Sequence, residues 1–241
     1  MKAFLLRVFA DTSTVGYYSP HLDGCPVLLP VPEPRLDPGR LPDHLDPWRV
    51  RDPCAGRPLA WYMPLGGEWP LHRDPRLDLG FYTEPLGRRG RLPSSLGRGW
   101  LLVFAAGLAE YPGGFWDERR RRAEILAAYR RARLAGRARV YAVAVLDVER
   151  VVDVVDWGRA PPCLRVSPHA AVGEPARAVV GRAYTLDPPA PLEPPWGHLA
   201  GRLERLARGR FRLGTLGDRS VVLDWLSRRS RLVYTGGSCS T

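Results

Sequence analysis

Two short apolar runs on either side of an arginine-rich segment constrain the fold of this 241-residue chain most strongly. The runs are WLLVFAAGL at 100–108 and VYAVAVLDV at 140–148, and their length and composition predict buried strands. The segment at 117–136 has the pattern of a surface helix, with Asp117 as its N-cap. This strand–helix–strand unit is long enough to join parallel neighbours in one sheet, although it does not require that order.

The rest of the chain adds strands and helices around this unit. We expect strands at 2–10 and 178–186 and helices at 197–209 and 218–230, the last with Asp218 as its N-cap. Proline-rich segments at 34–79 and 156–195 carry little periodic signal and are predicted to be irregular. The predicted fold is therefore a single α+β domain over 1–241. Its centre is a mixed β-sheet or a PUA-like, partly closed barrel, with a crossover helix and C-terminal helices.

Composition points to a heat-resistant protein without a membrane span. The chain has no Asn or Gln, a single Lys and 25 Pro, which is typical of hyperthermophiles. It has no apolar run of 18 residues and no signal-peptide pattern at its start, so we expect a cytoplasmic location and no membrane partner. The four cysteines form no C-x-x-C motif, and we expect separate apolar side chains. One disulfide stays open, because intracellular proteins of hyperthermophiles do contain them.

The net charge of +11 is concentrated in two stretches. Residues 117–139 and residues 201–232 each hold nine arginines against three acidic residues. Localised positive charge is what a polyanion site needs, and nearby aromatic rings are typical of single-strand or flipped-base sites. The candidate nucleic-acid contacts are Arg119, Arg122, Arg130, Arg133 and Trp116. The alternative for each stretch is a solvated helix face.

The loop that follows the first predicted strand contains a candidate reactive cluster. Asp11 and Ser13 are candidate catalytic residues, and Ser19, His21 and Asp23 would line the same site. The alternative is ordinary turn chemistry, because Asp and Ser are common in turns.

Two near-copies of one motif supply the remaining candidates. They are His44-Leu45-Asp46-Pro47 and His72-Arg73-Asp74-Pro75, and we take His72 and Asp74 as candidate catalytic residues. Proline favours an extended residue before it, so each His and Asp could face one point and together hold a metal. We prefer local turns and assign no metal ligand. The chain has no P-loop, G-x-S-x-G or H-E-x-x-H motif, so no motif supports an enzyme claim.

The order of several short boxes resembles the nucleotide-modification-associated domain family, third type. The boxes that carry the resemblance are Ser19-Pro20, Asp23-Gly24, Pro30-Val31-Pro32-Glu33, His72 to Pro75, Gly99 to Ala106, Tyr141 to Val148, and the final segment 205–232. The chain departs from the family at Trp100, where the family has an acidic residue, and in an expanded proline-rich insert at 34–70. The family is linked to DNA base modification, so the resemblance implies a nucleic-acid or nucleotide context but supplies no reaction.

These observations predict a protein that binds DNA or a nucleotide, with the early loop, His72 and Asp74 lining one site bordered by the arginines. One alternative is a non-catalytic PUA-like reader of modified bases with a cage of Tyr111, Phe115 and Trp116. Another is a His/Asp metal-dependent enzyme acting on nucleotides, and a scaffold without a reaction is the plainest. The sequence leaves the cofactor, the oligomeric state and the existence of a reaction undetermined.

Overall fold

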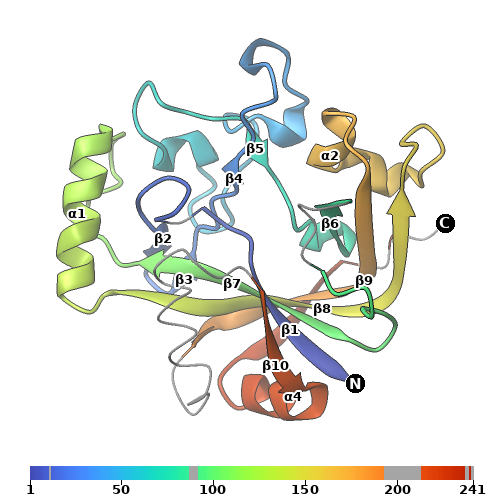
Figure 1. Cartoon of the computed structure of the whole chain (residues 1–241). Coiled ribbons are helices and arrows are strands. Elements are labelled where there is room, and N and C mark those ends of the chain that lie inside the picture. The colour runs from blue at the N-terminus through green and yellow to red at the C-terminus, as the bar shows by residue number, and fades with distance from the viewer. Residues whose placement is uncertain (11, 87–91, 193–212, 237–238, 240–241) are drawn as a thin grey trace.

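The computed structural model describes the whole chain except residues 11, 87–91, 193–212, 237–238 and 240–241 (Figure 1). The strands are β1 (Lys2–Arg7), β2 (Ser19–Leu22), β3 (Cys25–Pro26), β4 (Val31–Pro32), β5 (Leu71–His72), β6 (Phe81–Pro85), β7 (Leu101–Ala109), β8 (Ala138–Val154), β9 (Ala176–Pro191), β10 (Leu213–Asp218) and β11 (Arg231–Gly236). The helices are α1 (Arg122–Leu134), α2 (Pro168–Ala171) and α4 (Arg219–Ser227).

The described residues form a nine-stranded mixed sheet at the centre. Six of its strands follow the order β10-β1-β7-β8-β9-β11, and the other three, β2, β3 and β6, lie off this path. Strands β1 and β7 run parallel, whereas β7 and β8 are antiparallel neighbours although α1 connects them. All nine residues of β7 are buried, as expected for a strand that is covered on both faces. The two apolar runs that dominate the sequence therefore lie side by side in the sheet.

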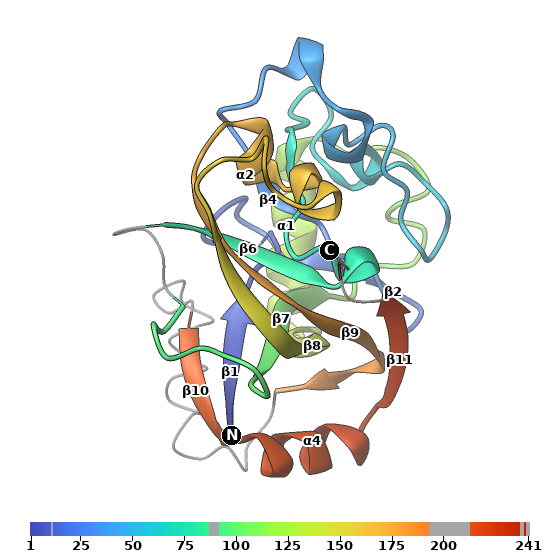
Figure 2. The same ribbon diagram turned by 90° about the vertical axis from the view of Figure 1, so that its right-hand side faces the viewer.

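The sheet curls because β8 and β9 are long, bulged strands that pair along most of their lengths. Gly181 of β9 lies at the tightest approach: a Cβ atom there would be 1.9 Å from the carbonyl oxygen of Asp147. Only glycine fits this contact between neighbouring backbones. Strand β6 pairs with the first half of β9, and β11 pairs with its middle (Figure 2).

Apolar side chains cover both faces of the sheet. On one face, Val222, Trp225 and Leu226 of α4 pack against residues of β1 and β7. Helix α4 follows Asp218 as predicted, although the Asp218 side chain makes no capping hydrogen bond. On the other face, Phe104, Tyr82 and their neighbours form a second cluster. The predicted helix at 197–209 lies outside the described residues.

Helix α1 packs its buried residues, including Ile125 and Tyr129, on a layer made by the early loop and the irregular segment. It begins four residues later than the sequence pattern indicated, with Arg121 and not Asp117 as its N-cap. Residues 113–116 form turns before the helix, and residues 117–118 form a bend. Asp117 is therefore not the cap that the sequence predicted.

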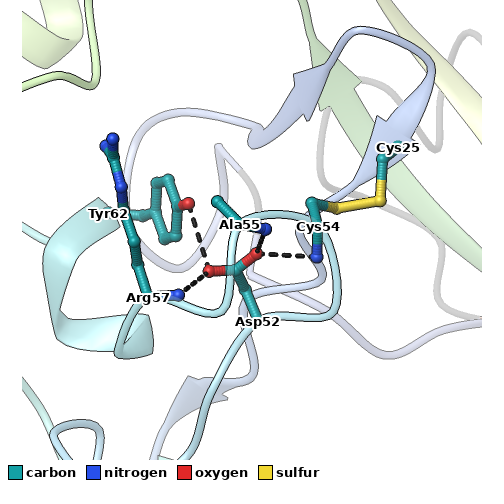
Figure 3. The surroundings of a disulfide bond; sticks show 6 residues. All are labelled: Cys25, Asp52, Cys54, Ala55, Arg57 and Tyr62. Atoms are coloured by element: carbon teal, nitrogen blue, oxygen red, sulfur yellow. Dashed lines mark hydrogen bonds between the residues drawn. A yellow bond between two sulfur atoms is a disulfide. The ribbon is translucent and has the colours of Figure 1, made fainter.

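The irregular segment 34–79 is ordered by buried polar contacts and a disulfide (Figure 3). Asp52, which is buried, accepts hydrogen bonds from the backbone N–H groups of Cys54, Ala55 and Arg57 and from the hydroxyl of Tyr62. A disulfide joins Cys54 to Cys25 of β3. A second disulfide joins Cys163 to Cys239. The expectation of four separate cysteines is therefore wrong, because the fold brings partners 29 and 76 residues apart within 6 Å between Cα atoms.

The chain is an α+β protein with a mixed, strongly curled sheet of half-barrel form, a crossover helix and a C-terminal helix. None of the helices in the described ranges has the length and apolar composition of a membrane-crossing helix.

Candidate metal centre

A two-stranded ladder brings together two boxes that the sequence analysis singled out separately. Strands β4 and β5 pair antiparallel with Val31 opposite His72 and Pro32 opposite Leu71. The ladder continues with a hydrogen bond from the Glu33 N–H to the Pro70 carbonyl, 2.9 Å long. Glu33, the last residue of the Pro30–Glu33 box, therefore lies next to His72, and its Oε2 is 2.9 Å from the His72 Nδ1.

Asp74 is fixed two residues further on by a tight turn. Its N–H donates to the His72 carbonyl over 2.9 Å, so this motif forms a three-residue turn and not the extended segment of the metal-binding alternative. The Asp74 carboxylate accepts the Thr83 N–H at 3.0 and 2.9 Å and also the Thr83 hydroxyl. Burial raises the pKa of Asp74 to about 7, against the effects of His72, Thr83 and Arg76.

His169 of α2 completes the group and comes from a segment far along the chain from His72 and Asp74. Ser167 is the N-cap of α2, and its Oγ accepts the His169 N–H over 3.2 Å. The Ser167 hydroxyl is also 2.8 Å from the Thr83 hydroxyl, so a chain of hydrogen bonds connects the start of α2 to Asp74. The rings of His169 and His72 meet edge to face with centroids 4.9 Å apart.

Carboxylates hold the Nδ1 atoms of both histidines. The Nδ1 of His169 is 3.1 Å from the Oε2 of Glu174, in the same way as His72 contacts Glu33. Arg35 links the two carboxylates: its Nε and Nη2 donate to Glu33 over 2.8 Å, and its Nη1 donates to Glu174 over 2.7 Å. Burial alone would raise the pKa of each glutamate, but hydrogen bonds from Arg35 and the histidines lower both pKa values below their ordinary range.

These contacts fix the protonation pattern of the two imidazoles. Because Glu33 and Glu174 are ionised and can only accept, each histidine carries its proton on Nδ1 when neutral. Burial lowers the pKa of His169 to about 4, helped by the charge of His72, so the His169 ring is neutral near pH 7. Its Nε2 is buried and has no hydrogen-bond partner among the described residues. A bare lone pair in the interior calls for a cation or a donor.

One potential ligand atom each from His72, Asp74 and His169 lies within 4.8 Å of the others. Two imidazoles and one carboxylate form a ligand set that zinc and non-haem iron use, and three protein ligands leave further positions for water or substrate. Carboxylates that orient the ligating imidazoles are the usual outer contacts of such sites. The arrangement can therefore hold a divalent transition-metal ion.

The early loop packs against α1 and lies apart from this group. Arg122 of α1 donates a hydrogen bond of 3.0 Å to the carbonyl oxygen of Val15. Ser13 is exposed, and Asp11 lies outside the described residues. The Oγ of Ser19 is buried and accepts the Leu29 N–H, while Asp23 occupies the left-handed turn between β2 and β3. Both have structural roles here.

Of the other loop and motif candidates, His21 and His44 lie outside the metal group. His21 packs its ring against Tyr141, with centroids 5.5 Å apart. In the other His-x-Asp-Pro motif, at 44–47, His44 lies in a short 3-10 turn and Asp46 accepts the Trp48 N–H over 2.8 Å. The preferred interpretation of that motif as a turn is consistent with this geometry, and only the copy at His72 contributes to the group.

The arginines of the first basic stretch differ in their surroundings. Arg119 forms an ion pair with Glu68 and lies over the ring of Trp48. Arg122, Arg130 and Arg133 are exposed on α1. Helices α1 and α2 lie on opposite sides of the β4–β5 ladder, so the structure divides the single site that the sequence predicted (Figure 1).

The predicted aromatic cage is a packed cluster. Trp116 is 4% exposed, and its ring meets Tyr62, Tyr111 and Phe115 edge to face. Phe115 and Tyr111 stack on each other at 5.3 Å. Because the three rings fill one another's faces, the assignment of Trp116 as a base contact conflicts with its burial.

Sequence reasoning missed His169, Glu174, Glu33 and Arg35 as site residues. The Ser167-Pro168 pair before His169 is a helix-start signal, and Glu33 already belonged to a box of the resemblance. Neither signal shows that both reach His72. Comparisons with family models, curated proteins and solved structures find no match to this chain.

Proposed function

We propose that the protein is a divalent-metal-dependent enzyme whose centre is His72, Asp74 and His169, acting on a nucleotide or nucleic acid. The observation that carries the proposal is the buried Nε2 of His169, which has no partner in the described part of the chain and belongs to a group of three ligand atoms within 4.8 Å. A metal ion there would coordinate that lone pair. The carboxylates of Glu33 and Glu174 would orient the two imidazoles.

The chemistry of such a centre follows from its ligands. A divalent ion held by two neutral imidazoles and one carboxylate keeps a net positive charge. It can lower the pKa of a bound water and polarise a phosphoryl or carbonyl oxygen. Hydrolysis is therefore the reaction class that we assign. Nucleotides as the substrate class rest on the family resemblance, in which His72 to Pro75 is one of the boxes.

Metal loading tests the centre. Zinc added to chelator-treated protein should bind with one equivalent and raise the melting temperature, because it binds the folded chain. His72→Ala should abolish both effects, while His21→Ala, which removes an imidazole outside the group, should retain both. Zinc binding that survives in His72→Ala would refute the assignment.

Turnover tests the reaction class. The zinc-loaded protein is incubated with nucleoside mono-, di- and triphosphates and with short single-stranded and duplex DNA, and the release of phosphate or of cleaved product is measured. Asp74→Asn should lose that product formation. Stoichiometric zinc without any metal-dependent turnover in this panel would refute the hydrolytic assignment and leave the metal centre standing.

A separate observation favours nucleic-acid binding by α1. Arg130 and Arg133 are exposed and one turn apart, which gives α1 a basic outer face. We expect weak DNA binding whose affinity falls with salt, with a log–log slope of about −0.9 per phosphate contacted. Replacing both arginines with glutamine should reduce that slope by about two. Arg228→Gln, just after α4, is the control, and an equal slope in all three proteins would refute the assignment.

A further inference from the structure

A second cluster of polar side chains lies beside the metal group and is not explained by it. Arg76 side-chain exposure is only 8%, and its Nε and Nη2 donate to Asp78 over 2.9 and 2.7 Å. Its third nitrogen, Nη1, is buried and has no hydrogen-bond partner within the ranges that the structure describes. Buried guanidinium nitrogens are normally hydrogen-bonded, so an unpartnered Nη1 indicates a missing acceptor.

Arg73 and His44 belong to the same neighbourhood. The Nη2 of Arg73 reaches the Oδ2 of Asp78 only at 3.9 Å, and its side chain is 30% exposed. The ring of His44 makes a hydrogen bond with the backbone of Val166, and its Nε2 is buried without a partner among the residues described. Burial lowers the pKa of His44, and the charges of Arg76 and Arg73 lower it further, with Asp43 opposing. The charges of both arginines therefore act on the His44 ring.

The charges in this cluster do not cancel. Asp78 is the shared ion-pair partner of Arg73 and Arg76, which leaves one positive charge in excess. Bringing like charges together in a partly buried place costs free energy unless an anion joins them. Residues 72–76 alternate between the two clusters, because His72 and Asp74 supply the metal group while Arg73 and Arg76 supply this one.

We propose that Arg73, Arg76 and His44 form a subsite for a phosphate group of the substrate, next to His72, Asp74 and His169. The Nη1 of Arg76 would donate to a phosphate oxygen, and the partly exposed Arg73 would close over it. A phosphate would supply both the missing acceptor and the missing negative charge. Calling this phosphate part of a substrate rests on the proposed function, whereas binding of the anion itself does not.

The test uses chelator-treated protein, so that a phosphate cannot bind through a metal. Histidine ring signals are followed by NMR across pH with inorganic phosphate, with deoxythymidine 5′-monophosphate, and with deoxythymidine as the arm that lacks phosphate. The His44 signal is assigned with His44→Gln. An anion near the ring should raise the pKa of His44 by about one unit. We expect this rise with both phosphate compounds and none with deoxythymidine.

Arg73→Gln is the informative variant, because Arg73 is partly exposed and makes only a long contact with Asp78. It should weaken phosphate binding by about tenfold or more. Arg228→Gln, which removes the exposed arginine that pairs with Asp224 of α4, should bind phosphate like the parent protein. A His44 pKa that stays constant in phosphate would overturn the proposal, as would a rise of the same size in Arg73→Gln. Neither result depends on whether zinc binds, so this test can fail while the metal centre stands.

Discussion

Glu33→Gln should weaken zinc binding although it replaces none of the proposed metal ligands. The Glu33 carboxylate accepts four hydrogen bonds: Oε1 takes the Arg35 N–H and Nε, and Oε2 takes the Arg35 Nη2 and the His72 Nδ1. A carboxamide keeps the shape but has one oxygen. In either orientation its NH₂ group faces two donors, and the negative charge beside His72 is lost.

The size of the effect follows from the position of Glu33 behind the ligand. Loss of a carboxylate that orients a ligating imidazole typically costs 10- to 100-fold in metal affinity, which is about 1.4 to 2.7 kcal/mol. We therefore expect the zinc Kd of Glu33→Gln to rise by about that factor. Glu174→Gln should behave in the same way through His169, because Glu174 is the counterpart of Glu33.

The assay is isothermal titration of chelator-treated protein with zinc at pH 7.5, with a competing chelator where binding is tight. Glu68→Gln is the matched control. Glu68 also pairs with an arginine, but that arginine is Arg119, which precedes α1 and is not part of the metal group. Its zinc Kd should equal that of the parent protein. Equal Kd values for Glu33→Gln, Glu174→Gln and the parent, with all three folded, would refute the reasoning.

Three further predictions concern pH, backbone packing and the disulfide. Zinc affinity should fall about tenfold per pH unit below pH 7, because zinc must displace the proton of Asp74, whose pKa is about 7; titrations between pH 5.5 and 8 measure this. Without metal, the raised pKa of Asp74 stabilises the fold at low pH, and that contribution is lost as pH rises through 7. Gly181→Ala should destabilise the fold by several kcal/mol in urea unfolding, because its Cβ would lie 1.9 Å from a carbonyl oxygen. Replacing Cys25 and Cys54 together with serine should cost about 3 to 4 kcal/mol, since the disulfide closes a loop spanning 29 residues.

Each of these has a contrary result. A zinc Kd that is constant from pH 5.5 to 8 would exclude Asp74 as a ligand with a raised pKa. Unchanged urea midpoints for Gly181→Ala would mean that β8 and β9 do not approach as closely as described. Equal stability of the oxidised parent and the double serine variant would show that the pair is not bonded in solution.

The sheet could be predicted because burial leaves a mark on composition. The run at 100–108 corresponds to β7, and the run at 140–148 lies within β8. Strands that are covered on both faces need a continuous apolar sequence, so both could be recognised. Their antiparallel pairing did not follow, because a crossover helix allows either order. The late start of α1 also escaped prediction, since Asp117 is a good cap residue whose use depends on the turns around it.

Only part of the candidate site could be predicted from the sequence. His72 and Asp74 stood out as a motif, but a two-residue ladder between β4 and β5 carries too little pattern to place Glu33 beside them. His169 enters through a hydrogen-bond chain from Ser167 to Thr83, and no local signal encodes such a contact across 84 residues. The early loop was misplaced because the position of a loop after a strand does not fix its neighbours.

The most direct test is anomalous diffraction at the zinc edge from crystals of zinc-loaded protein. We predict a single strong peak within about 2.0 to 2.2 Å of the Nε2 atoms of His72 and His169 and of an Asp74 carboxylate oxygen. A density map with no ion at that position, and with the His169 Nε2 bonded to a water or to a protein donor, would contradict the metal centre.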